Sequence, residues 1–177
     1  MLNLSLFKTR PHGLCPGRQR IFGGSMSKFR YKEGDVFAVT LEDGGFCLGV
    51  VARMPKGGKV LLGYFFGPRL ASMPRIDEIP RLNPEKAVKV VKFGDLFLMN
   101  GRWPVISHIE DWDRARWPMP RFVRRDEISK RAFLVAYSED DPKTQLAEER
   151  CDFDISGFEK DSVWGAGFAE TVLAKAL

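Results

Sequence analysis

Apolar residues fall into short runs along this chain, and turn residues separate one run from the next. Runs at 36–41, 46–53 and 59–66 have the length of β-strands and consist largely of Val, Leu, Phe, Ala and Gly. Asp43-Gly44, a dipeptide typical of tight hairpins, stands between the first two, and Gly57-Gly58 precedes the third. The pattern predicts three short antiparallel strands, which are the usual material of a small barrel or meander.

Residues 67–87 break this pattern with four prolines, Pro68, Pro74, Pro80 and Pro84. Prolines at this spacing leave room for at most one short helical turn between them. We therefore expect a connector that lies on the surface or bridges two sheets.

A second group of strand-like runs follows the connector, at 88–99, 103–109, 122–125 and 131–137. Asn100-Gly101 predicts a hairpin between the first two runs, and residues 126–130 predict another between the last two. The pattern Lys-x-Gly-Asp-[Val/Leu]-Phe occurs at 32–37 and again at 92–97, which suggests two similar β-units.

The end of the chain has a different composition. Residues 138–161 contain nine acidic and three basic residues, and Asp141-Pro142 predicts a short helix through Glu149. Phe168, Val172 and Ala176 are spaced as one face of a C-terminal helix. The predicted fold is α+β but mainly β: small barrel-like units of short antiparallel strands with a C-terminal helix, in a single domain at 26–177.

The net charge of +5 is concentrated at the start of the chain. Residues 1–25 hold four basic residues and no acidic one, so the remainder is nearly neutral. This leader has no periodicity, whereas a well-patterned sequence begins at Met26. Our hypothesis is that translation starts at Met26 and that residues 1–25 are disordered or are translated upstream DNA. A mitochondrial-type transit peptide is the alternative, because the leader contains arginine and lacks acids.

Composition gives little support for catalysis. The 3 cysteines contain no C-x-x-C pair, and with 2 histidines they form no metal framework. His108, followed by Glu110, Asp111 and Asp113, is a candidate acid–base pair, although a strand-end histidine with a structural hydrogen bond is the commoner case. We therefore predict no catalytic residue, no metal and no cofactor. With no bilayer-spanning run and no secretory signal, the expected location is the cytoplasm.

Binding is the better-supported function class. Residues 92–125 hold three of the four tryptophans and contain Arg-Trp-Pro twice, at 102–104 and 116–118. Trp and Arg are the residue types most enriched at binding hot spots. The predicted partner contacts are Trp112, Arg116, Trp117, Arg121 and Phe122. Two alternatives stay open: the tryptophans are core residues, and the basic cluster pairs with the acidic segment 138–161 of the same chain.

Three segments carry a family resemblance: Lys32–Val39 with its Asp-Gly hairpin and Gly49-Val50-Val51, then Phe93–Leu96, then Asn100–Ile106. Together they resemble the immunity protein 26 family of bacterial polymorphic toxin systems, over roughly residues 29–137. The resemblance implies a non-enzymatic β-rich protein that binds and neutralises a cognate toxin in the cytoplasm, and it carries over no contact residue. The nearly neutral body departs from the acidic balance expected of a nuclease inhibitor, so the activity of the toxin stays open. The alternative function is a nucleic-acid-binding small barrel that uses the same Arg/Trp surface.

Overall fold

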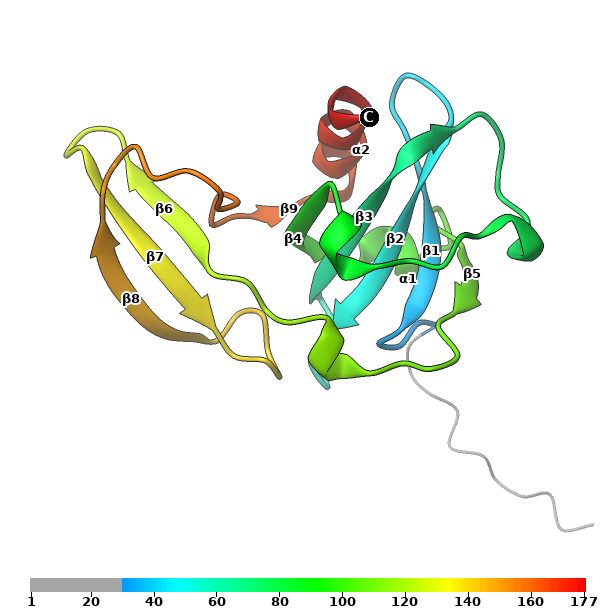
Figure 1. Ribbon diagram of the computed structural model, residues 1–177, viewed down its shortest axis with the longest axis horizontal. Coiled ribbons are helices and arrows are strands. Elements are labelled where there is room, and N and C mark those ends of the chain that lie inside the picture. The colour runs from blue at the N-terminus through cyan, green and yellow to red at the C-terminus, as the bar shows by residue number, and fades with distance from the viewer. Residues whose placement is uncertain (1–29) are drawn as a thin grey trace, which may run out of the picture.

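The computed structural model describes residues 30–177, and the predicted leader at 1–25 lies outside the described residues. The larger of two sheets has six strands in the order β5-β1-β2-β3-β4-β9 (Figure 1). Neighbouring strands are antiparallel except for β4 and β9. The strands are β1 (Asp35–Thr40), β2 (Phe46–Arg53), β3 (Val60–Leu70), β4 (Lys89–Gly94), β5 (Val105–His108) and β9 (Val163–Trp164).

The three predicted N-terminal strands are confirmed as β1, β2 and β3. The Asp43-Gly44 turn joins the first two, with Gly44 at a φ of +97° and Gly45 at +78°, values that favour glycine. The prediction that the strands after the connector form a second β-unit is wrong for β4 and β5, because both join the sheet of β1, β2 and β3. The proline-rich connector folds back, so that β4 pairs with β3 from Val60↔Gly94 to Phe65↔Lys89.

The predicted hairpin at Asn100-Gly101 is also wrong. After β4 the chain forms a short helix, α1 (Leu96–Met99), and Asn100 ends that helix. β5 then lies at the opposite edge of the sheet, next to β1. The two Gly-Asp pairs of the repeated pattern therefore have different structural positions. Gly34-Asp35 begins a strand, whereas Gly94-Asp95 ends one and leads into α1.

The smaller sheet contains three antiparallel strands, β6 (Phe122–Asp126), β7 (Arg131–Tyr137) and β8 (Gln145–Cys151). The predicted hairpin at 126–130 is confirmed, and Asp126 accepts the backbone N–H groups of Ile128 and Ser129 in its turn. The predicted short helix through Glu149 is wrong, because the acidic segment forms β8 against β7 instead. The carboxylates of β8 have arginine partners beside this sheet, which favours the strand over a helix.

The predicted C-terminal helix is confirmed as α2 (Ala166–Ala176). Its buried face differs from the predicted one: Ala166, Ala169, Glu170 and Leu173 are buried, whereas Phe168 is 57% exposed. Three short 3-10 turns complete the described fold, η1 (Ile76–Glu78), η2 (Pro84–Lys86) and η3 (Arg114–Arg116). The fold is mainly β, as predicted, but neither sheet closes into a barrel.

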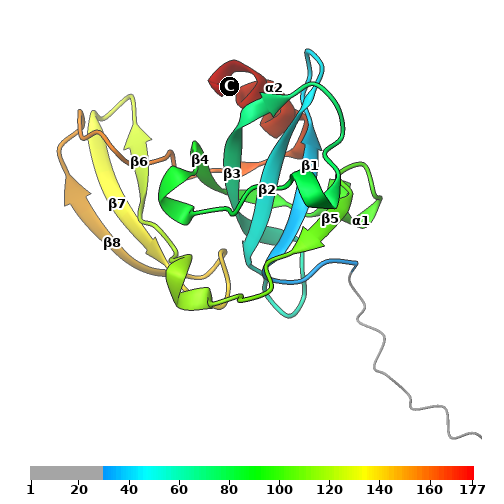
Figure 2. The ribbon, with the colours of Figure 1, turned by 45° about the vertical axis from the view of Figure 1, so that its right-hand side comes forward.

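Apolar clusters cover the two faces of the larger sheet. The Trp103 cluster lies under α1 and α2 and includes Phe37, Phe65, Phe93 and Trp103, each 0% exposed. The Trp117 cluster lies on the other face, where the connector crosses the sheet (Figures 1 and 2), and it includes Val50, Leu62 and Phe122. Regular helices close the first face, whereas extended segments and short turns close the second.

Candidate functional site

The predicted contact segment crosses the second face of the larger sheet. Two of its residues are core residues of the described chain: Trp117 is 3% exposed and Phe122 is 0% exposed. Trp117 packs edge-on against Tyr64, at 5.1 Å between ring centroids, and lies beside Trp112 at 5.5 Å. Trp112 is half-buried, and Arg116 and Arg121 are exposed. The segment therefore presents the Trp112 ring and two exposed arginines, while the rings of Trp117 and Phe122 are buried beneath them.

Local hydrogen bonds fix the turn that carries Arg116. The Asp113 side chain accepts the N–H of Ala115 at 3.0 Å and so caps η3. Beyond the turn, the Tyr64 hydroxyl donates to the carbonyl oxygen of Pro118 at 2.6 Å. Burial raises the pKa of Tyr64 to about 12, and Arg53 and Glu139 act on it in opposite directions. The Tyr64 hydroxyl therefore stays protonated across the neutral pH range and keeps its hydrogen bond to the backbone beside Trp117.

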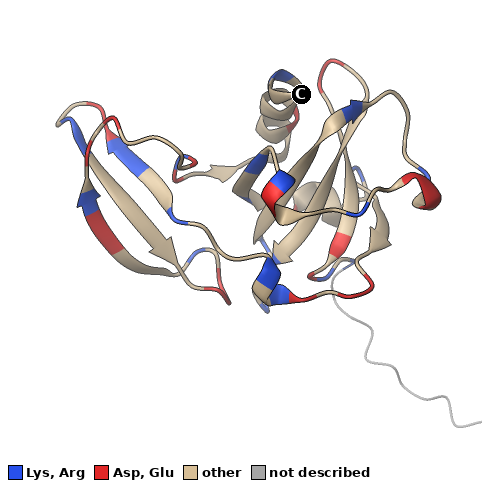
Figure 3. Cartoon of the chain, in the orientation of Figure 1, with Lys and Arg blue, Asp and Glu red and all other residues tan. Residues whose placement is uncertain are grey.

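Most arginines of the basic cluster pair with the acidic segment, which confirms that alternative interpretation. Arg114 contacts Asp140 at 2.7 Å, Arg121 contacts Glu149 at 3.1 Å and Arg124 contacts Glu148 at 2.7 Å. Arg125 donates to the Phe153 carbonyl at 2.8 Å. Figure 3 shows the resulting arrangement, in which basic residues of β6 and acidic residues of β8 flank β7.

Arg116 differs from the rest of this cluster. Its guanidinium is exposed and makes no hydrogen bond or ion pair with any other residue in the range 30–177. Because η3 is capped and Trp117 is buried, the position of its backbone is fixed while its charge stays unneutralised. An arginine in this state can bind a carboxylate or phosphate of a partner.

A buried ionic network fixes the smaller sheet to the larger one. Lys92 of β4 contacts Asp161 at 2.8 Å, and the two side chains are 4% and 5% exposed. Tyr137 donates its hydroxyl to Asp161 at 2.8 Å, and Arg124 contacts the same carboxylate at 2.6 Å. Burial raises the pKa of Asp161, but the hydrogen bonds from Lys92, Tyr137 and Arg124 outweigh it, so the net shift is downward. The charge of Arg124 is therefore already paired with Asp161 and Glu148, which leaves it less able to bind a phosphate.

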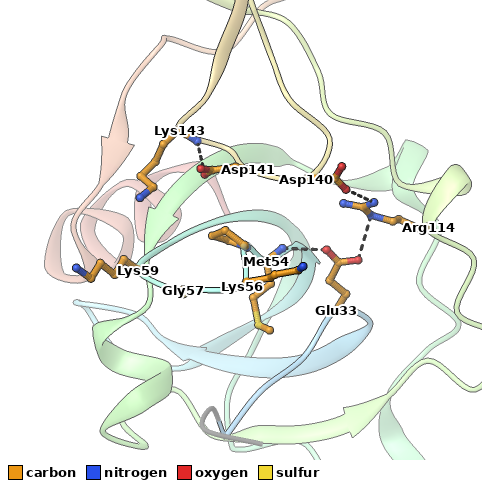
Figure 4. A pocket seen from close by; sticks show the side chains of 11 residues that line it. Glu33, Met54, Lys56, Gly57, Lys59, Arg114, Asp140, Asp141 and Lys143 are labelled. Carbon is orange, nitrogen blue, oxygen red and sulfur yellow. Dashed lines mark hydrogen bonds and ion pairs between the residues drawn. The ribbon is translucent and has the colours of Figure 1, made fainter.

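A hollow with a volume of about 860 Å³ lies between the β2–β3 turn and the β7–β8 loop (Figure 4). Arg114 joins Glu33, at 3.1 Å, to Asp140 across it, and Glu33 also accepts the N–H of Met54. Buried Arg53 pairs with Glu139 beside it. Its central charges are thus already paired, and the hollow is a junction between the two sheets.

A second hollow, of about 470 Å³, lies between the connector and the segment at 107–117. We name it the connector hollow. Its apolar lining is Val36, Ile76, Ile79, Pro80, Leu82, Ile109 and Trp117, and its polar lining is Arg81, Ser107, His108, Glu110, Asp111 and Arg116. Sequence reasoning missed the connector side of this hollow, because the spacing of prolines does not indicate which face of a sheet a connector covers.

His108 lines this hollow, and its partner is Asp35. The two groups lie 2.9 Å apart, from Nδ1 to Oδ1, and Asp35 is 6% exposed. The sequence pattern suggested Glu110, Asp111 or Asp113 as partners, whereas the strand pairing of β1 with β5 brings Asp35 opposite His108. Asp35 also accepts the N–H of Lys32 at 2.8 Å, so the carboxylate holds both a turn and the histidine ring.

Gly34 explains why Trp112 and His108 can lie against this turn. Its φ is +86°, and an added Cβ would lie 2.8 Å from the His108 ring and 2.9 Å from the Trp112 ring. Its carbonyl oxygen accepts the N–H of Ile109 at 2.9 Å, which anchors the start of the contact segment. The Gly-Asp pair singled out in the sequence therefore organises one end of the site.

Residues 30–177 contain neither a cluster of metal-ligating side chains nor a membrane-spanning helix. Within that range, no group of three or more His, Cys, Asp and Glu side chains could hold a metal ion. None of the described helices has the length and apolar character needed to cross a membrane.

Comparison with known proteins agrees with the resemblance carried by the sequence motifs. Curated proteins and solved structures gave no significant match. A family model described as immunity protein 26 matches residues 32–134, a range that holds β1–β6, the connector and most of β7. That range also contains Gly34, Asp35 and all of the predicted partner contacts. Because the match covers more than half of the chain, this protein belongs to the immunity protein 26 family.

Proposed function

We propose that this protein binds a cognate toxin protein and neutralises it by occlusion, in the cytoplasm of the bacterium that makes both. The family supports a role in immunity to a toxin. Occlusion needs a rigid surface and no chemistry of its own, which agrees with the prediction that the protein is not an enzyme. The observation that carries the proposal is Arg116, an exposed arginine on a capped turn above a buried tryptophan, which has no ion pair within residues 30–177.

The proposed contact surface refines the residues predicted from the sequence. Trp112, Arg116 and Arg121 would touch the toxin directly, whereas Trp117 and Phe122 would support them from below. Arginine and half-buried aromatic side chains at the centre of an interface contribute most of its binding free energy. Nucleic acid is the weaker alternative, because intramolecular carboxylates and carbonyl groups already pair with most of the basic cluster.

Growth rescue tests the proposal directly. The full chain is expressed with the product of the neighbouring gene in a sensitive bacterium, and the two proteins are co-purified. We expect rescue and a stable complex, and we expect Arg116→Glu to weaken toxin binding by at least about tenfold.

The matched control is Arg150→Glu, which reverses another exposed arginine, on β8. This control should leave binding unchanged. A neighbour that is harmless, or a toxic one that the wild-type chain does not restrain, would contradict the proposed function. Binding to a DNA duplex that weakens steeply with salt would favour the nucleic-acid alternative.

A further inference from the structure

The hollow of about 860 Å³ between the two sheets, which we name the junction hollow, is lined by four basic and three acidic side chains. Arg114 pairs with two of the acids, Glu33 at 3.1 Å and Asp140 at 2.7 Å. The third acid, Asp141, accepts the backbone N–H of Lys143 at 3.0 Å and so shapes the β7–β8 loop. Asp141 is thus the one carboxylate of this lining without a basic partner among the described residues.

The three lysines of the lining are Lys56, Lys59 and Lys143, and all of them are exposed. Their ammonium groups form no ion pair or hydrogen bond with any residue in the range 30–177. Lys56 and Lys59 belong to the β2–β3 turn and Lys143 to the β7–β8 loop, so the lysines stand on opposite walls of the hollow (Figure 4). Three unpaired ammonium groups against one such carboxylate leave the hollow with an excess of positive charge.

The backbone of Lys59 gives independent evidence that its side chain has a role. Its φ is +79°, a conformation that favours glycine. Its N–H donates to the Asp95 carboxylate at 2.7 Å, and its carbonyl oxygen accepts the N–H of Asp95 at 3.0 Å. The hydroxyl of buried Tyr31 donates to the same carboxylate at 2.6 Å. Glycine would adopt this fixed conformation with less strain, so the stability of the turn does not explain a lysine here.

Lys130 provides the comparison, because it is the other non-glycine residue of the described chain with a positive φ, at +51°. Its ammonium group pairs with Glu127 at 3.0 Å and lies 4.9 Å from the centroid of the Phe153 ring. The side chain of Lys130 therefore has contacts within the fold, whereas the ammonium group of Lys59 has no such contact within residues 30–177. Strained residues concentrate at binding sites, which favours a ligand outside the chain as the partner of Lys59.

We propose that the junction hollow binds a compact phosphate-bearing polyanion, such as the triphosphate group of a nucleotide. Lysine ammonium groups bind phosphate as point charges, and three of them around one hollow suit a ligand with several negative charges. The guanidinium of Arg114, whose forked geometry would favour a carboxylate ligand, is already paired with Glu33 and Asp140. A volume of about 860 Å³ lies within the range of small-molecule sites.

This site is separate from the proposed toxin contacts, since none of Trp112, Arg116, Trp117, Arg121 and Phe122 lines the junction hollow. The proposal therefore goes beyond the proposed function and does not depend on it. Because the lysines come from both sheets, the bound anion would join the β2–β3 turn of the larger sheet to the β7–β8 loop of the smaller one.

Titration with inorganic tripolyphosphate tests the site. The probe is added to the ¹⁵N-labelled full chain at constant ionic strength and followed by amide chemical shifts. We expect saturable shifts at residues 54–59 and 140–143, with a dissociation constant on the order of 0.1 mM. Sodium sulfate at the same ionic strength should produce no saturable shift there. Equal responses to the two salts, or tripolyphosphate shifts confined to the basic residues 1–25, would overturn the proposal.

Two glycine substitutions provide a matched pair of variants. Lys59→Gly relieves the strained backbone and removes the ammonium group, so we expect at least about fivefold weaker tripolyphosphate binding without a lower melting temperature. Lys130→Gly makes the same backbone change outside the hollow and should bind tripolyphosphate like wild type. Equal affinity of the two variants would show that Lys59 does not contact the anion and would contradict the proposal.

Thermal unfolding tests whether the anion joins the two walls. Tripolyphosphate at about a hundredfold excess over its dissociation constant should raise the melting temperature of the wild-type chain by about 5 °C. The double variant Lys59→Gly/Lys143→Gln, which removes one lysine from each wall, should lose most of this shift. If the double variant binds tripolyphosphate with unchanged affinity and shows the full shift, the junction hollow is not the binding site.

Discussion

The tripeptide Arg-Trp-Pro occurs twice in this protein, and its two copies have opposite roles. At 102–104, Trp103 is 0% exposed, and its indole N–H donates to Glu170 at 3.1 Å. Arg102 contacts the same carboxylate at 2.8 Å and lies over the Phe97 ring at 4.3 Å. The indole N–H and the guanidinium of this copy thus both have a partner in α2, so the copy is structural.

At 116–118 the same three residues leave polar groups unpaired. The Trp117 indole makes no hydrogen bond, and Arg116 no ion pair, with any residue of the described part of the chain. The Trp117 ring still packs among Tyr64, Phe66 and Trp112. A motif rich in Trp and Arg therefore indicates binding only where the fold leaves its polar groups without internal partners.

Truncating each tryptophan should separate the two copies most clearly. Trp103→Ala removes a fully buried ring between regular elements and leaves Glu170 buried with one partner fewer, so we expect a loss of about 5 kcal/mol in the free energy of unfolding. Trp117→Ala should cost about 3 kcal/mol, because the walls of the adjoining hollow can close over the gap. Urea denaturation measures both values. Equal losses would show that the Trp117 face is as rigid as the other.

Substitutions at two glycines should show the same contrast in stability with smaller effects. Gly34→Ala places a Cβ against the Trp112 ring in a backbone with φ at +86°, so we expect a loss of about 3 kcal/mol and altered Trp fluorescence. Gly101→Ala, with φ at +79° and open space around the added Cβ, should lose only about 1 kcal/mol. If Gly34→Ala behaves like Gly101→Ala, Trp112 does not depend on the turn that carries Gly34.

Local sequence signals predicted much of the fold. Asp43-Gly44 and the turn at 126–130 gave the correct hairpins, because short turns are determined by the residues within them. Asn100-Gly101 carries an equally strong signal but ends a helix instead, since the edge next to β1 is where β5 finds a partner. That pairing joins residues far apart in the chain, and no local pattern reports it.

The candidate site was predicted less completely than the fold. The enrichment of Trp and Arg marked the stretch of chain that carries the candidate site, but it could not separate buried Trp117 from half-buried Trp112. Arg114 and Arg124 look like Arg116 in the sequence, and only the folding of residues 138–161 shows that the first two pair with acidic residues of that segment, whereas Arg116 forms no ion pair within residues 30–177. The connector residues that line the hollow were missed because the path of the connector is determined by tertiary packing.

The arginines of the two tripeptides give the smallest stability effects and the sharpest contrast in function. Arg102→Ala removes a partner of buried Glu170, so we expect a loss of about 1 kcal/mol in the free energy of unfolding. Arg116→Ala should change that free energy by less than about 0.5 kcal/mol, since the side chain is exposed and has no ion pair among the described residues. Toxin binding should follow the reverse order: Arg116→Ala should weaken it at least about tenfold, whereas Arg102→Ala should leave it unchanged.

Calorimetric titration of the purified complex measures the binding, and thermal unfolding of each free variant measures the stability. Arg102 is 54% exposed, so its removal also tests whether a surface arginine of the structural copy contributes to binding. Comparable loss of toxin binding in both variants would mean that the partner covers both tripeptides, and the assignment of separate roles to the two copies would be wrong.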